Sequence, residues 1–154
     1  MTTNLKKFFN QKDDKFIVLS IKPQYADLIL ARIKTVEFRR AWATKDVNTI
    51  AIYASSPIQR IVGLVKVNVT LKASPSKLWK ICSEHRGGLT KRELLDYFNG
   101  KPLGNAVLLQ DAIKFKRAID PNKFIENFYP PQSFQYLNST QVNKLKKIIS
   151  DNGL

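Results

Sequence analysis

The sequence contains a single cysteine, Cys82, and a single histidine, His85. One cysteine excludes a disulfide within the chain and fits a reducing compartment. The two residues have a C-x-x-H spacing, but a zinc site needs three or four protein ligands, and the chain has no other cysteine or histidine. We therefore expect no metal site and no cofactor, and we expect Cys82 to pack in the core.

Long apolar runs are also absent. The chain has no stretch of about 18 apolar residues, and no apolar segment follows the first lysines of MTTNLKKFFN, so we expect neither a transmembrane helix nor a secretory signal. The same N-terminus carries no myristoylation motif. The sequence therefore predicts a cytoplasmic protein that does not bind membranes.

Acidic residues are few. The chain has 12 Asp and Glu against 26 Lys and Arg, which gives a formal net charge of +14. Such a field attracts polyanions before any specific contact forms, so nucleic acid is the leading partner class. The 154 residues, 44% of them hydrophobic, are enough for one globular domain with one core.

The apolar pattern predicts short strands and helices in the order β-α-β-β-β-α-α-β, followed by helices. β-branched runs and period-two alternation predict strands at 16–21, 35–40, 49–55, 60–71 and 104–115. Apolar stripes, prolines and capping residues predict helices from Pro23 to about Ala31, after Ser74, after Thr90, from Pro121 to Phe128 and after Ser139. This order indicates an α+β fold, a small mixed β-barrel decorated by short α-helices.

Three segments are expected along the chain. Residues 1–15 lack a sustained periodicity and are predicted to form a flexible N-terminal arm. Residues 16–138 form the domain. Residues 139–154 are predicted to form a basic amphipathic helix that packs on the domain through Val142, Leu145, Ile148 and Ile149.

The stretch RIKTVEFRR, residues 32–40, places one carboxylate among four basic side chains. In a strand, Thr35, Glu37 and Arg39 would point to one face. Glu37 would then accept hydrogen bonds from a base while Lys34 and Arg39 engage phosphate or ribose. The alternative is an ion pair between Glu37 and Arg39 that only stabilises the strand.

The segment LSIKPQYADLILARIKTVEFRR resembles the opening of the ASCH domain, a member of the PUA-like superfamily of small β-barrels with the signature G-x-K-x-x-E-x-R. Lys34, Glu37 and Arg39 match the lysine, glutamate and arginine of the signature, whereas Arg32 stands at its glycine. IAIYASSP, IVGLVKV, LWKIC, GLTKRELLDYFNG and PPQSFQYL are similar to the subgroup that begins S-I-K-P-x-Y-A and is described as a predicted transcriptional regulator. The resemblance covers about residues 16–138.

The resemblance implies a PUA-like barrel that binds RNA in a cleft beside the helix after the first strand. Independently, cations interleaved with tyrosines suit phosphates and unstacked bases. The residues predicted to bind nucleic acid or a nucleotide are Ser20, Lys22, Tyr25, Arg32, Lys34, Glu37, Arg39, Arg40, Tyr53 and Ser55. A role in capping a strand or packing the core remains the alternative for the serines and for Tyr25, and Trp42 and Trp79 are expected to pack.

Some ASCH proteins are enzymes. A branch that hydrolyses acylated cytidine uses a lysine, a threonine and a glutamate, and its threonine stands at the position of Glu37. Lys34, Glu37 and Thr35 are therefore the catalytic candidates, although Thr35 would need a base such as Lys34 within hydrogen-bond reach. In a ribonuclease-like branch, Glu37 would serve as base beside Lys34 or Arg39.

No complete pair of nucleophile and base is visible, so the first prediction is a regulatory protein that binds single-stranded RNA or a nucleotide. The alternatives are an enzyme acting on RNA or a modified nucleoside, either a ribonuclease or an amidohydrolase, and a protein-interaction module that uses the segment 129–137. The sequence does not predict an oligomeric state.

Overall fold

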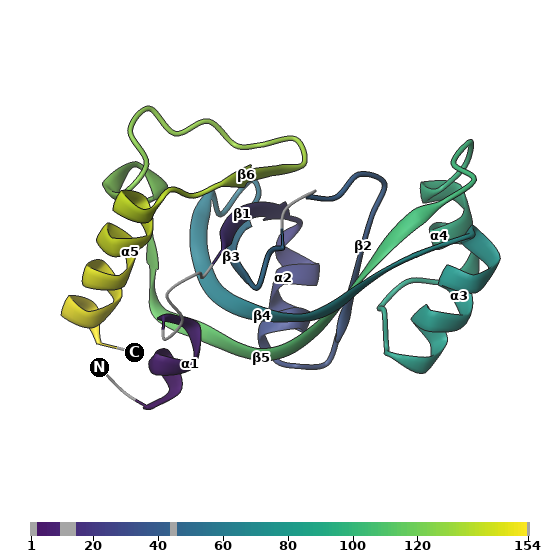
Figure 1. Ribbon diagram of the computed structural model, residues 1–154, viewed down its shortest axis with the longest axis horizontal. Coiled ribbons are helices and arrows are strands. Elements are labelled where there is room, and N and C mark those ends of the chain that lie inside the picture. The colour runs from purple at the N-terminus through teal and green to yellow at the C-terminus, as the bar shows by residue number, and fades with distance from the viewer. Residues whose placement is uncertain (1–2, 10–14, 44–45, 154) are drawn as a thin grey trace.

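A computed structural model describes residues 3–9, 15–43 and 46–153, which form both helices and strands (Figure 1). The helices are α1 (Thr3–Phe9), α2 (Pro23–Leu30), α3 (Pro75–Glu84), α4 (Lys91–Tyr97) and α5 (Ser139–Asn152), with a 3₁₀ turn η1 (Pro121–Lys123). The strands are β1 (Phe16–Ile21), β2 (Val36–Arg39), β3 (Thr49–Ala54), β4 (Arg60–Ala73), β5 (Gly104–Ile119) and β6 (Phe134–Tyr136). All five predicted strands are present, and β6 is a sixth.

The strands form one six-stranded sheet in the order β2-β5-β4-β3-β1-β6. β1 and β3 are parallel, and every other neighbouring pair is antiparallel. The sheet curls around α2 as a half-barrel (Figure 1). The predicted α+β class with a mixed barrel is therefore confirmed.

Two cores lie on opposite faces of this sheet. α2 packs on one face through Ala26 and Ile29, against Ile17 and Leu19 of β1. On the other face, α1 and α5 pack against Phe16 and Val18 of β1 and against β3, β4 and β5. Because β1 is buried on both faces, its sequence FIVLSI is an almost continuous apolar run.

A third core lies where β4 and β5 extend beyond the barrel. These strands have 14 and 16 residues, long enough to reach α3 and α4 (Figure 1). There Phe38 of β2 packs with Leu78 of α3, and with Leu94 and Phe98 at α4. Ser74 caps α3, and Thr90 forms a capping box with Glu93 at α4, as the sequence predicts.

The predicted flexible arm contains an ordered helix in its described part. Leu5 and Phe8 of α1 are buried, and the Phe9 ring stacks on Phe16 with 5.2 Å between centroids. The helix docks because Leu5 and Phe8 are three residues apart and fall on one helical face. Residues 1–2 and 10–14 of the arm lie outside the described residues.

Two helix boundaries differ from the predicted ones. The helix expected from Pro121 to Phe128 is only the turn η1, because the Asn122 side chain accepts a hydrogen bond from the Phe128 backbone N–H (3.2 Å) instead of leaving that donor to a helix. The last helix is capped by Asn138 rather than Ser139, in a capping box with Gln141. Its predicted apolar stripe does pack on the domain.

The edges of the sheet are β2 and β6. β6 lies in the segment 129–137, so the edge that the interaction-module alternative requires is present, and its use by a partner stays a prediction. Among the described helices, none is long and apolar enough to cross a membrane.

Candidate functional site

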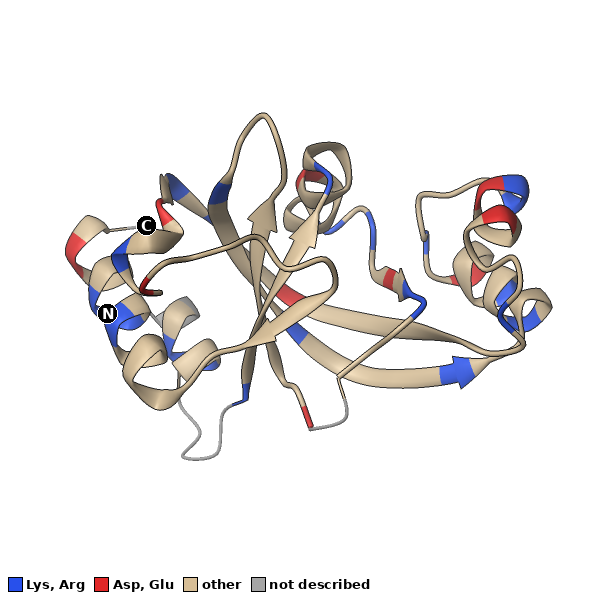
Figure 2. Cartoon of the chain, turned by 90° about the horizontal axis from the view of Figure 1, so that it is seen from above, with Lys and Arg blue, Asp and Glu red and all other residues tan. Residues whose placement is uncertain are grey.

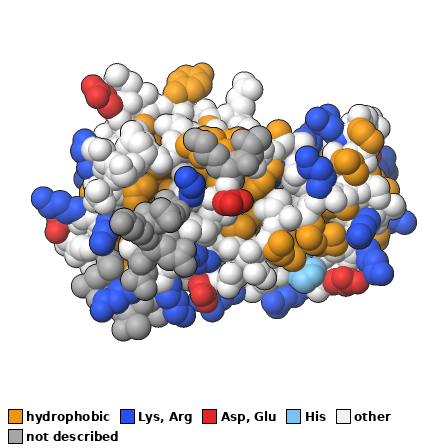
Figure 3. Space-filling view, in the orientation of Figure 1, with side chains coloured by type: hydrophobic (Ala, Val, Ile, Leu, Met, Phe, Trp, Pro, Cys, Tyr) orange, Lys and Arg blue, Asp and Glu red, His pale blue; other side chains and the backbone are white. Residues whose placement is uncertain are grey.

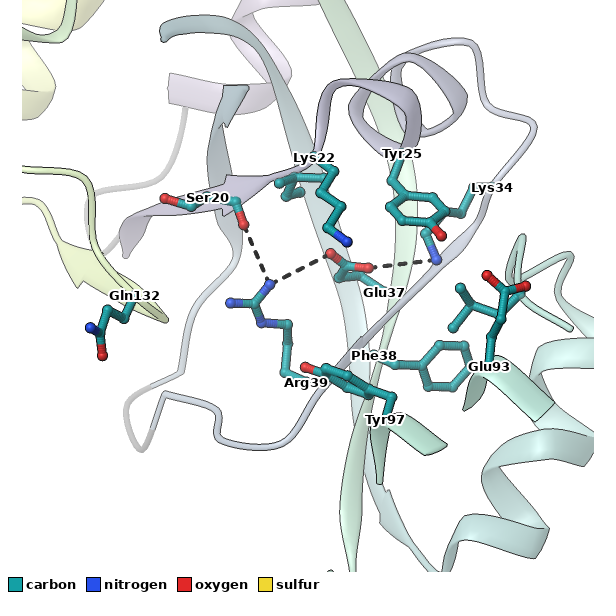
Figure 4. A pocket seen from close by; sticks show the side chains of 12 residues that line it. Ser20, Lys22, Tyr25, Lys34, Glu37, Phe38, Arg39, Glu93, Tyr97 and Gln132 are labelled. Carbon is teal, nitrogen blue, oxygen red and sulfur yellow. Dashed lines mark hydrogen bonds and ion pairs between the residues drawn. The ribbon is translucent and has the colours of Figure 1, made fainter. Parts of the chain in front are cut away.

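A pocket of about 440 Å³ lies between the end of β1, the start of α2, β2 and α4 (Figure 4). Its lining residues are Ser20, Ile21, Lys22, Tyr25, Lys34, Glu37, Phe38, Arg39, Leu89, Glu93, Tyr97 and Gln132. Six of the ten residues predicted to bind a ligand therefore lie together: Ser20, Lys22, Tyr25, Lys34, Glu37 and Arg39.

A tight turn after α2 brings the two halves of this set together. Pro23 starts the helix directly after β1, so Lys22 and Tyr25 lie at the rim. The helix ends at Leu30, where the backbone N–H groups of Ile33 and Lys34 both donate to the Leu28 carbonyl. The chain therefore reverses and enters β2 beside the start of the same helix.

The carboxylate of Glu37 lies between two cations in this pocket. Its Oε1 is 3.5 Å from Lys34 Nζ, and its Oε2 is 3.8 Å from Arg39 Nη1. Glu37 is 8% exposed, and the Lys22 side chain extends toward its carboxylate (Figure 4). The ion pair between Glu37 and Arg39 that the sequence left as an alternative is present, and Lys34 extends it to a triad.

Lys34 is the most buried charge of the site, at 2% exposure. Its ammonium donates to the Gly87 carbonyl and lies 5.7 Å from the Tyr25 ring centroid and 5.5 Å from that of Phe38. A buried cation needs such partners, because its desolvation costs several kcal/mol. Lys34 is thus a fixed positive charge beneath Glu37 rather than a mobile surface lysine.

Arg39 fastens the opposite wall of the pocket. Its Nη1 donates to the Ser20 carbonyl at 3.4 Å, and its Nη2 donates to the Ser133 carbonyl at 3.2 Å. The Ser20 hydroxyl donates to the Pro131 carbonyl at 2.9 Å. These bonds tie the segment before β6 to the end of β1, so the guanidinium is held in one orientation beside Glu37.

α4 supplies a wall that the sequence analysis did not assign to the site. Glu93 and Tyr97 are one helical turn apart and face the pocket (Figure 4). Hydrogen bonds from the Thr90 backbone and hydroxyl hold the pKa of the Glu93 carboxyl below its usual value, and the charge of Lys22 acts in the same direction. The capping box identifies Glu93 in the sequence, but only the packing of α4 brings it near β2.

The remaining predicted residues lie outside the pocket. Arg32 is exposed, 3.4 Å from Asp111, and the Thr35 hydroxyl donates to the His85 carbonyl. Tyr53 is buried against Phe128, and burial raises the pKa of its phenol. Arg40 and Ser55 also lie outside it: the Arg40 guanidinium donates to the Tyr97 carbonyl at 2.9 Å, and the Ser55 N–H donates to the Ile21 carbonyl.

The basic side chains are spread over the whole molecule. Lys and Arg lie on the helices at both ends as well as near β2 (Figure 2), and on the face shown in Figure 3 few Asp and Glu lie among them. Among the described residues, no three His, Cys, Asp or Glu side chains lie together as metal ligands would. The charges of the pocket itself are therefore those of lysine, arginine and glutamate.

Comparisons with known proteins find relatives over most of the chain. A sequence model described as "ASCH domain" matches residues 19–115. An "ASCH domain-containing ribonuclease" of Zymomonas mobilis is 31% identical over 141 residues, which are 90% of this chain and 95% of that protein. The crystal structure of ASCH from Zymomonas mobilis superposes with a TM-score of 0.81 and 30% identity, over 88% of this chain and 96% of that one.

Proposed function

Since the chain belongs to the ASCH domain family, with the PUA-like fold of its solved relative, we propose that it binds single-stranded RNA in the pocket around Glu37 and cleaves it. The observation that carries the proposal is the Glu37 carboxylate held between Lys34 and Arg39, with Lys22 at the rim. The name of the Zymomonas relative supports the same substrate class.

The chemistry that this arrangement supports is attack by the ribose 2′-hydroxyl on the adjacent phosphorus. Glu37 accepts the hydroxyl proton as general base while the bond from O2′ to phosphorus forms. The bond from phosphorus to O5′ breaks, and the Lys22 ammonium gives its proton to the leaving O5′. The products are a 2′,3′-cyclic phosphate and a 5′-hydroxyl.

The two fixed cations, Lys34 and Arg39, stabilise negative charge and do not transfer protons. Negative charge grows on the phosphate oxygens in the transition state, and preorganised donors stabilise it without reorganisation. Lys34 and Arg39 are already held by the Gly87, Ser20 and Ser133 carbonyls. Tyr25 and Tyr97 on opposite walls offer ring faces on which a base stacks.

The test is cleavage of an end-labelled single-stranded RNA by Glu37→Gln. Loss of the general base predicts a fall in rate of about 10²–10⁴-fold, with RNA binding retained. Glu126→Gln is the matched control, because Glu126 is exposed and does not line the pocket. A substrate with 2′-deoxyribose at the cleaved position must resist the wild-type protein. Equal cleavage by Glu37→Gln would refute the assignment of the base.

A second candidate is binding without cleavage, as a regulator needs. The observation that favours it is that Lys34 and Arg39 already pair with Glu37. A carboxylate that is paired in this way can stabilise the fold of the pocket without acting as a base. RNA that binds in a Lys22-dependent manner and stays intact would select this candidate. The amidohydrolase alternative finds less support, because the Thr35 hydroxyl donates to a backbone carbonyl outside the pocket.

A further inference from the structure

A second hollow, of about 920 Å³, lies beside the pocket, and we propose that it holds the nucleotides that follow the one bound at Glu37. The inference rests on the proposed RNA-binding function and adds a separate site to it. The residues that line the hollow come from the segment between β2 and β3, from β4 and from β5. They are Arg40, Ala41, Trp42, Ala43, Asp46, Val47, Asn48, Val67, Asn68, Val69, Thr70, Lys72 and Asn105.

The wall of the hollow includes a strand edge without a neighbour. β4 pairs with β3 only as far as Lys66, whereas it pairs with β5 as far as Ala73. In the part of the chain that the structure describes, no strand therefore covers the other edge of β4 beyond Val67. Alternate backbone N–H and C=O groups of such an edge face outward and bond an extended ligand.

Arg40 connects the hollow to the pocket. It follows Arg39 directly, and the two residues line different cavities. The Asn105 amide donates to the carbonyls of both, at 3.2 and 3.5 Å, which fixes the chain at this point. The Arg40 Nη1 donates to the carbonyls of Tyr97 (2.9 Å) and Asn99 (3.4 Å), so α4 sets its direction. An RNA chain that leaves the pocket along β2 would meet this guanidinium next.

The chemistry of the hollow fits an anionic strand with bases. Among the described residues that line it, Arg40 and Lys72 are two cations against the single carboxylate of Asp46, in a chain whose net charge is +14. Trp42 offers an indole on which a base stacks, held by Phe134 at 6.3 Å between ring centroids. The exposed Asn68 amide adds sequence-tolerant hydrogen bonds. The cations together with the indole favour RNA over a neutral extended peptide, which would use the strand edge alone.

Fluorescence tests the proposal directly, because the chain has only two tryptophans. Trp79→Phe leaves Trp42 as the sole reporter, and Trp42→Phe leaves Trp79, which lies on α3 and packs against the third core. A 2′-O-methyl oligouridine of about eight nucleotides cannot be cleaved through its 2′-oxygen, and it spans both sites. We expect it to quench Trp42 and not Trp79, and we expect uridine monophosphate to quench neither.

Affinity separates the two sites. Lys72→Gln, alone and with Arg40→Gln, should weaken the oligomer about tenfold and leave uridine monophosphate unchanged. The slope of the logarithm of affinity against the logarithm of salt concentration should be smaller in magnitude by about 1.4 in the double variant, because two contacts are lost at about 0.7 each. Lys77→Gln with Lys80→Gln is the matched control, because both lysines are exposed on α3.

The failures are distinguishable. Oligomer binding that depends on Lys22 but leaves Trp42 fluorescence and the Lys72→Gln affinity unchanged would overturn the second site and keep the pocket. Binding of neither ligand would overturn both proposals. Quenching of Trp42 by an extended β-branched peptide, with none by the oligomer, would assign the hollow to a protein partner and overturn the RNA proposal.

Discussion

Arg32 occupies a backbone conformation that ordinarily suits glycine. Its φ is 60°, in the left-handed region where a Cβ crowds the following carbonyl. The ASCH signature has its glycine at this position. The structure shows that the chain keeps the turn between α2 and β2 with an arginine there, so the turn carries backbone strain.

Arg32→Gly should therefore stabilise the protein, by about 0.5–1 kcal/mol after the greater freedom of glycine in the unfolded chain is subtracted. The melting temperature should rise by about 1–4 °C in thermal unfolding. Asp111→Asn is the control, since it removes the exposed ion pair with Arg32, along with the one with Lys7, and leaves φ unchanged. A lower melting temperature for Arg32→Gly than for Asp111→Asn would contradict the assignment of strain.

The loop between α3 and α4 holds the start of β2 through its backbone. The His85 carbonyl accepts from the Thr35 hydroxyl, and the Gly87 carbonyl accepts from Lys34 Nζ. Gly87 is enclosed: a Cβ there would lie 2.4 Å from Cys82 Sγ and 2.8 Å from the Phe38 ring. The element that positions the buried lysine is thus itself fixed by close packing.

Gly87→Ala should displace this loop and lower stability by about 1–3 kcal/mol, measured by urea unfolding. The proposed RNA cleavage should fall further than the loss of stability explains, because Lys34 loses its carbonyl partner. Gly100→Ala provides the comparison: its Cβ would meet nothing within 4 Å, although φ is +82°. That variant should cost about 1 kcal/mol through strain and cleave RNA normally. Equal losses of cleavage in both variants would contradict the prediction that the loop between α3 and α4 positions Lys34.

Local sequence signals predicted most elements. The apolar run at 16–21, the proline at Pro23 and the Thr90 capping box each act within a few residues, so their structures follow from short-range chemistry. β4 departs from its predicted alternation at Val69 and Leu71, which are exposed by 41% and 38%. These residues lie beyond Lys66, the last residue of β4 that pairs with β3, and how far a partner strand reaches has no local signal.

The sequence predicted the part of the candidate site that the turn between α2 and β2 brings together. Residues 20–25 and 34–39 lie on adjacent elements, so the motif and its flanking residues identify them. Glu93, Tyr97 and Gln132 come from segments 50 residues or more away along the chain, and only tertiary packing brings them to β2. The depth of Lys34 was also not predictable, because a lysine in a basic run ordinarily faces water.

Over the whole molecule, the basic residues form more than one surface. The pocket and the hollow beside it contain Lys22, Arg40 and Lys72, whereas α5 carries Lys144, Lys146 and Lys147 at the far end. About four phosphate contacts with single-stranded RNA predict a slope of about −3 for the logarithm of affinity against the logarithm of salt. Filter binding over a salt series measures this slope.

Neutralising Lys22, Arg40 and Lys72 to glutamine should flatten the slope to about −1, because three contacts are lost at about 0.7 each. The same three substitutions at Lys144, Lys146 and Lys147 change the net charge equally and should leave the slope near −3. The reverse pattern would move the RNA path to α5, across the barrel from Glu37.

Ala73 at the end of β4 pairs with Gly104 at the start of β5, so the chain leaves this antiparallel pair of strands and returns to it at one place. Residues 74–103 are consequently an insertion in a hairpin, which evolution can exchange while the barrel register stays intact. That insertion carries Glu93 and Tyr97, one wall of the pocket. Any replacement must still cover Val36 and Phe38, so changes in this segment are constrained by the side chains of β2. The unit that forms this wall of the pocket can therefore be replaced without altering the barrel, provided that the new unit keeps an apolar surface against β2.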